Sequence, residues 1–167
     1  MSSTGARVAW WTIVVVLILG IAAATTIGVR QSDRSPVARP DPAAARHVVT
    51  DTIKSAVPKL LSYTPENVEA SLNSARSLLT GTFKESYGDM IDRTIIPAAK
   101  SQRITTAAEV VGTAVESLTD DTAKVLVFVN QETTKAADTA PTKTANSVRA
   151  GLQKVNGAWL IDGFDPL

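Results

Sequence analysis

The sequence has 167 residues, a formal net charge of +1, one histidine and no cysteine. This length fits one domain of ordinary size with a tail and leaves no room for two full domains. Lysine and arginine are scattered rather than gathered in runs, which argues against nucleic-acid binding. Without cysteine there is no disulfide or thiolate metal site, and the single histidine, His47, is too little for a structural zinc site.

The run of residues 8–29 contains no charged side chain. As a helix it reaches about 33 Å, enough to cross a hydrocarbon core of about 30 Å. Arg7 and Arg30 bracket the run, and Trp10 and Trp11 stand where aromatic residues of the membrane interface are expected. We therefore predict a transmembrane anchor in the cell membrane, preceded by a short cytoplasmic tail at 1–7.

Two features of this run leave alternatives open. A cleaved signal peptide with its cleavage site at Ala22–Ala24 is one alternative, although the apolar residues continue to Val29 and favour an uncleaved anchor. More arginines follow the run than precede it, which by the positive-inside rule places the domain in the cytoplasm. Large domains cross membranes largely regardless of such charges, so charge alone leaves the orientation open.

Residues 30–42 contain three prolines among serine, arginine and aspartate. Proline restricts the backbone to extended geometry, so we predict a semi-stiff linker that holds the next domain away from the bilayer. Residues 43–167 are then expected to form that domain.

Apolar side chains recur every three or four residues in three successive segments, which predicts amphipathic helices at about 43–63, 65–79 and 83–96. Thr64 and Pro65 suit the N-cap and the first position of the second helix, and Gly81 suits a left-handed C-cap after it. Pro58 should kink or break the first helix near its end. Pro97 should stop the third helix, with at most a short turn after it.

After Arg103 the apolar period changes to two, which predicts strands in a meander at about 104–118, 123–134, 148–155 and 158–164. The run VLVFVN is apolar on both faces at its centre and indicates a central strand. The dipeptide Asn156-Gly157 is a strong signal for a two-residue hairpin turn, whereas 135–146 is predicted to be a loop without core residues. Helices before an antiparallel sheet indicate an α+β domain, with the helices on one face.

Five aromatic residues are candidates for the wall of an apolar pocket between helices and sheet, or for the core itself: Tyr63, Phe83, Tyr87, Phe128 and Trp159. Helices wrapped on a curved sheet can enclose such a pocket. A dry, open pocket would favour a lipid- or steroid-binding domain. A pocket filled by these side chains would favour a scaffold.

Signals for catalysis are weak. The sequence has no nucleophile elbow, glycine-rich phosphate loop or paired metal ligands. Asp162 stands in a strongly apolar strand, where a steroid isomerase would need its base, but strand alternation also allows it to face solvent. Asp89 and Asp92 lie three residues apart, and Asp120 and Asp121 suit a turn, so both pairs fit solvated surfaces. We expect no enzymatic activity, no cofactor and no metal.

Four segments carry a resemblance to a known family: LLSYTPENVEASLNSARSLLTGTFKESY at 60–87, IIPAAK at 95–100, VLVFVNQ at 125–131 and GAWLIDGFDPL at 157–167. In this order and spacing they resemble the actinobacterial Mce-associated membrane proteins, accessory proteins encoded with mammalian cell entry (Mce) lipid-import systems. The resemblance covers about 43–167 and, in type, the anchor. Each segment by itself consists of core and turn residues, so their order carries the resemblance.

This resemblance implies a cone-like fold of the nuclear transport factor 2-like or SnoaL-like type, placed outside the cytoplasm. It also implies a non-enzymatic accessory subunit that assembles or stabilises an Mce-type lipid transporter. The substrate-binding chains or permease subunits of that transporter would be the partners, with lipid as a further candidate. No catalytic residues carry over. A scaffold subunit of a secretion apparatus is an alternative, because fold alone does not determine function.

Overall fold

The computed structural model describes residues 42–138 and 140–167. The following predictions lie outside these residues: the cytoplasmic tail, the anchor at 8–29 with Arg7, Trp10, Trp11 and Arg30, and the linker up to residue 41. Within the described ranges, no helix is long and apolar enough to cross a membrane.

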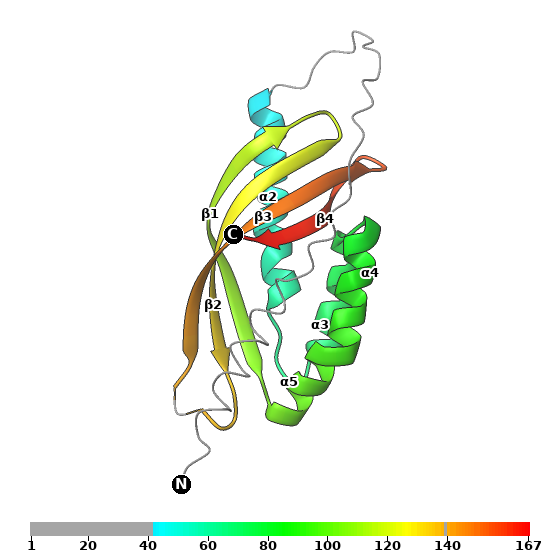
Figure 1. Cartoon of the computed structure of the whole chain (residues 1–167). Helices are drawn as coiled ribbons and strands as arrows, with labels where there is room; N and C mark the ends of the chain where they lie inside the picture. The colour runs from blue at the N-terminus through cyan, green and yellow to red at the C-terminus, as the bar shows by residue number, and fades with distance from the viewer. Residues whose placement is uncertain (1–41, 139) are drawn as a thin grey trace.

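Three helical segments precede the sheet in the described part of the chain (Figure 1). They are α2 at Pro42–Leu61, α3 at Val68–Ala75 with a 3₁₀ turn at Arg76–Leu78, and a rod made of α4 at Gly81–Met90, a π-helical turn at Ile91–Ile95 and α5 at Ile96–Gln102. The apolar spacing explains how they pack. In α3, for example, Val68, Leu72 and Ala75 share one face and are all buried.

Four antiparallel strands follow: β1 at Thr105–Leu118, β2 at Thr122–Thr134, β3 at Thr142–Val155 and β4 at Ala158–Pro166. Their order in the sheet is β1-β2-β3-β4, which makes β2 a central strand, as the VLVFVN run predicts. The prediction of an α+β domain, with helices before a four-stranded antiparallel sheet, is therefore confirmed.

The core lies between the helices and one face of the sheet (Figure 1). Along β2, Val125, Val127 and Val129 are buried on this face, whereas Lys124 and Phe128 are exposed on the other. Buried side chains of other elements complete the core, among them Val49, Ile53, Leu72, Leu152 and Ile161. Burying one aliphatic side chain contributes roughly 1.5–3 kcal/mol, so this contact between layers is the main source of stability.

The second helix begins later than predicted, because Thr64 is not its N-cap. The Thr64 N–H donates to Asn67 Oδ1 at 2.7 Å, and the Asn67 N–H donates to the Thr64 carbonyl at 3.2 Å. These bonds close a turn, and α3 starts after it at Val68. Short polar side chains compete with a first helical turn in this way.

Pro97 does not end the third helix, which continues to Gln102. Proline has no N–H to bond the carbonyl four residues earlier, so an interior proline normally breaks a helix. Here the chain widens just before it into the π-helical turn, in which the Ile96 N–H bonds the Ile91 carbonyl. Pro97 then falls in the first turn of α5, where the missing N–H costs little. Pro58 likewise lies within α2 without ending it.

Two predictions about turns are confirmed in their backbone conformation. Asn156 and Gly157 have φ values of 51° and 85°, as a two-residue hairpin turn requires. Gly81 has the expected left-handed φ of 60°, although it is the first residue of α4 rather than the cap of the preceding helix.

The predicted loop at 135–146 is wrong in its second half. β3 begins at Thr142, which pairs with Thr133 of β2. This part of the strand has few apolar side chains, so its extended form comes from backbone pairing with β2, which the sequence pattern does not reveal.

Candidate functional site

A small apolar pocket lies where α2, α3, α4 and the π-helical turn meet the sheet. Its volume is about 40 Å³. The wall combines aliphatic and aromatic side chains with the amide of Gln131 from β2. Tyr63, Phe83 and Tyr87, three of the five predicted aromatic residues, belong to this wall.

The pocket is narrow because aromatic rings occupy the space. Phe83 stacks against Phe164 of β4, with ring centroids 6.4 Å apart, and lies tilted against Tyr87 at 6.2 Å. The Tyr87 hydroxyl donates to the Leu60 carbonyl of α2 at 3.0 Å. These contacts join α4 to α2 and to the last strand.

Both tyrosines of the pocket are neutral at physiological pH. Burial raises the pKa of Tyr87 far above the ordinary value of 10.0. Burial also raises the pKa of Tyr63, against the opposing effect of a hydrogen bond with Thr106. Neither hydroxyl is therefore prepared to act as a base.

The pocket is too small for a lipid or a steroid. Small-molecule pockets typically enclose about 300–1,000 Å³, and a single water needs about 10–15 Å³. At about 40 Å³, this pocket has room for a few waters or a small side-chain tip. This size favours a filled domain interior and disfavours the lipid- or steroid-binding alternative.

Phe128 and Trp159, the other two predicted aromatic residues, do not line the pocket. Phe128 is 41% exposed on the opposite face of β2, because its strand neighbours take the inward positions, and its ring covers Gly112 of β1. Trp159 is half-buried at the edge of the core, with the Lys154 ammonium 5.7 Å from its ring centroid. In the run VLVFVN, apolar residues stand at both odd- and even-numbered positions, so alternation alone cannot assign Phe128 to one face of the sheet.

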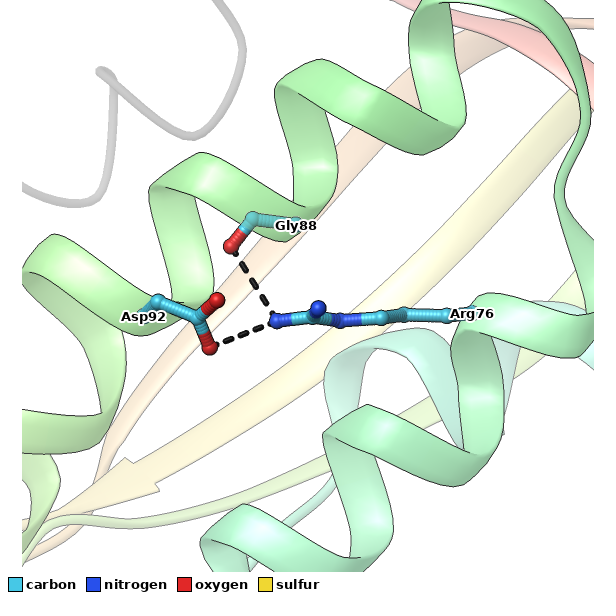
Figure 2. Close-up of polar contacts among 3 residues, drawn as sticks. All are labelled: Arg76, Gly88 and Asp92. Atoms are coloured by element: carbon cyan, nitrogen blue, oxygen red, sulfur yellow. Dashed lines mark hydrogen bonds and ion pairs between the residues drawn. The ribbon is translucent and has the colours of Figure 1, made fainter.

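Arg76 reaches from the 3₁₀ turn to the third helical rod (Figure 2). Its Nη2 donates to Asp92 Oδ1 at 2.5 Å and to the Gly88 carbonyl at 3.3 Å. The buried Nε has no hydrogen-bond partner in the described part of the chain. Because both side chains remain partly exposed, the ion pair adds little stability, but it ties the 3₁₀ turn to the π-helical turn. Sequence reasoning misses it because the two residues are 16 positions apart.

The remaining candidates for chemistry lie away from the pocket. Four of them are exposed: His47, Asp89, Asp120 and Asp121. Asp162 points to the face of the sheet opposite the helices, where its carboxylate rests against Gly151 and leaves no space for a side chain there. Burial raises the pKa of Asp162, but this acid and the pocket tyrosines are on opposite faces, unlike a steroid-isomerase site. In the described ranges, no three histidine, aspartate or glutamate side chains form a metal group.

The face of the sheet turned away from the helices, called the outer face below, carries charged side chains on all four strands. They are Glu109, Glu116, Lys124, Glu132, Lys143, Arg149, Asp162 and Asp165. Arg149 donates to both carboxylate oxygens of Glu116, at 2.7 and 3.0 Å, which raises the pKa of Arg149 and lowers that of Glu116. Sequence reasoning did not identify the residues of this face, although Lys124, Phe128 and Glu132 stand at even-numbered positions of β2 and therefore share one face.

A relative spans nearly the whole chain. The Outer membrane protein Rv1973 of Mycobacterium tuberculosis is 40% identical over 151 residues, which cover 90% of this chain and 94% of that protein. This chain belongs to the Rv1973 family. The Uncharacterized protein Rv1362c of the same organism is 36% identical over 155 residues, covering 93% of this chain and 70% of that protein. No family model matches the sequence.

Several solved structures share the fold of the described domain. An IcmL-like type IV secretion system protein of Legionella pneumophila has a TM-score of 0.61 at 10% identity, covering 77% of this chain and 93% of that one. CagV, a VirB8 homolog of Helicobacter pylori, has a TM-score of 0.58 at 12% identity, covering 72% and 96%. A protein of Novosphingobium aromaticivorans described as an aromatic ring hydroxylase has a TM-score of 0.53 at 10% identity, covering 76% and 90%. At such identities these similarities establish the fold and nothing more.

The described α+β domain therefore shares its fold with the IcmL-like protein and with CagV. The relatives and structures named above carry no Mce name.

Proposed function

We propose that this chain is a non-enzymatic scaffold subunit of a multiprotein apparatus in the cell envelope. Residues 8–29 would anchor it, and the α+β domain would lie outside the cytoplasm. Two observations support this placement: the fold also occurs in type IV secretion proteins, and one relative is named an outer membrane protein.

The observation that carries the proposal is the contrast between the two faces of the sheet. The helix-covered face encloses a pocket of about 40 Å³ whose tyrosines are neutral and engaged in structural contacts. The outer face exposes Phe128 among charged side chains from every strand. A domain with a filled interior and an open sheet is suited to binding other proteins rather than converting a substrate.

Two apparatuses are candidates. A secretion-type assembly comes first, because the fold is shared with such proteins. An Mce-type lipid transporter is the second candidate, because four segments of the sequence resemble Mce-associated membrane proteins. Both assign the chain the same task, which is to hold membrane-anchored subunits together. An anchor raises the effective concentration of weak contacts, so a modest interface is sufficient.

The test is to purify the tagged full-length chain from a mycobacterial host in mild detergent and to identify the subunits that remain bound. In a deletion strain we measure the amount of the assembled complex, protein secretion and uptake of a labelled lipid. We expect the complex and one of the two outputs to fall together. The wild-type gene and the Tyr63→Phe variant should both restore them, because the pocket hydroxyl takes part in no chemical step.

The outcome identifies the apparatus or rejects the scaffold. A loss of secretion with bound secretion subunits supports the first candidate, and a loss of lipid uptake with bound Mce subunits supports the second. If Tyr63→Phe abolishes the output while the protein stays folded and bound to its subunits, the pocket is catalytic and the proposal is wrong.

A further inference from the structure

One end of the outer face carries a positive side chain on β2 and a negative side chain above β3. In the register of the sheet, Phe128 of β2 stands beside Ser147 of β3, near the middle of both strands. Four residues from Phe128 toward the start of β2, Lys124 stands beside Gly151 of β3. The carboxylate of Asp162 lies over Gly151, so an acid occupies the β3 position of this row.

At the other end of the face the two signs are exchanged. Four residues beyond Phe128, Glu132 of β2 stands beside Lys143 of β3, with their charged atoms 3.6 Å apart. Along β2 the sign therefore changes from positive to negative, and above β3 it changes from negative to positive. Turning the face end for end about Phe128 places each of these four charges on the position of its opposite.

We propose that two copies of this chain associate through their outer faces, with their strands antiparallel and a twofold axis close to Phe128. In this arrangement Lys124 faces Glu132 of the second copy, and Asp162 faces Lys143 of the second copy. Each contact occurs twice, because a twofold interface uses the same surface on both subunits. This inference is independent of the proposed function and of the apparatus.

The size and composition of the face suit such a contact. The strands β1, β2 and β3 have 14, 13 and 14 residues. At about 3.3 Å per residue and about 4.8 Å between strands, these three strands give a surface on the order of 700 Å². A standard interface buries about 800 Å² per partner. Phe128 is 41% exposed at the centre, and Val111, 53% exposed, lies close to it at a bulge of β1. An apolar centre with charges at its ends is the usual anatomy of an interface.

The charges favour a second copy over a different protein. Each end row contains one positive and one negative side chain, so neither row selects a partner of one charge sign. The Arg149–Glu116 pair neutralises itself within the chain. Glu109 and Asp165 stand on the edge strands β1 and β4, at the rim, where solvent remains.

The first test uses the absence of cysteine from the chain. Ser147→Cys places one thiol close to the proposed axis, and Ser77→Cys places a matched thiol on the exposed 3₁₀ turn of the helical layer. Both variants of the full-length protein are oxidised in membranes of the expression host, with two differently tagged copies. We expect a disulfide-linked homodimer from Ser147→Cys and at least about tenfold less from Ser77→Cys.

The second test exchanges charges in the Ser147→Cys background. Lys124 and Glu132 are eight residues apart on one strand, about 26 Å, which exceeds the Debye length of about 8 Å, so they do not interact within a chain. Lys124→Glu alone and Glu132→Lys alone should each reduce the cross-linked dimer roughly tenfold, because each places like charges opposite one another. Co-expression of the two variants should restore a dimer between them, because opposite charges then meet at both positions.

Two results overturn the proposal. One is a Ser147→Cys cross-link that is no stronger than that of Ser77→Cys, or one that joins the chain to a different protein. The other is a failure of the co-expressed charge variants to recover the dimer while both remain folded by circular dichroism. Because a merely structural effect of either charge change would not be relieved by the other variant, recovery identifies contact between two copies.

Discussion

At the scale of single residues, Tyr87 joins two helices through one polar contact inside an apolar layer. Its side chain is 4% exposed, and its hydroxyl donates to the Leu60 carbonyl at 3.0 Å. A buried phenol is costly to ionise, which is why its pKa is raised. The stability of the packing of α4 on α2 therefore depends on pH through this residue.

We expect Tyr87→Phe to lower the free energy of unfolding by about 1–2 kcal/mol near pH 7, because the Leu60 carbonyl loses its donor. The folded-state pKa lies above 10.0, so the contribution of Tyr87 is complete below pH 10 and is lost as the pH rises beyond it. Urea unfolding followed by circular dichroism should show the difference between wild type and variant narrowing as the pH rises from about 10 to about 11. A constant difference across this range would mean that Tyr87 is not buried.

At the scale of elements, β1 shows which part of the sheet is protected. It is an edge strand of 14 residues, and its pairing with β2 shifts register near Val111 and near Glu116. A bridge between Tyr63 and Thr106 covers its first end. Bulges and covered ends hinder strand addition along an edge. The surface left for contact is therefore the outer face rather than the β1 edge.

The hairpin between β3 and β4 depends on backbone conformation at its turn. Gly157 has a φ of 85°, which a side chain disfavours, so Gly157→Ala should lower the free energy of unfolding by about 1–2 kcal/mol. Gly163→Ala is the matched control in β4: its φ is not positive, and no atom lies within 4 Å of the added methyl group, so we expect little change. Urea unfolding of both variants measures the difference. Equal effects would show that the turn tolerates a side chain.

At the scale of the whole molecule, all described helices lie on one side of the sheet (Figure 1). The helix-covered face of the sheet packs into the core, and the outer face remains available for contacts. The turn between β2 and β3 is a second exposed feature, and Ala137 stands in it. Its accessibility reports which side of the membrane the domain occupies.

We expect a cysteine at Ala137 to react with a membrane-impermeant maleimide in intact cells, because the domain is proposed to lie outside the cytoplasm. The native chain contributes no thiol. A cysteine at Ser3, in the predicted cytoplasmic tail, is the control and should react only after permeabilisation. The reverse pattern would place the domain in the cytoplasm, as the positive-inside count suggests.

The sequence by itself was sufficient for features that depend on near neighbours. Apolar spacing located the helices, and alternation located the strands except for the first part of β3. The run around Phe128 marked a central strand because apolar residues stand at both odd- and even-numbered positions. Asn156-Gly157 specified its turn because few residues tolerate positive φ. These patterns depend on backbone geometry over only a few residues.

Only the tertiary structure decided which face each side chain takes and which distant residues meet. The same parity ambiguity that marks β2 as central leaves Phe128 unassigned, until burial of its neighbours turns it to the outer face. The pocket is closed because Phe83 meets Phe164 from the far end of the chain, and Arg76 finds Asp92 only when two helical segments pack. The charge rows of the outer face arise from strand register. Such contacts depend on distance in space, and local sequence patterns carry no measure of it.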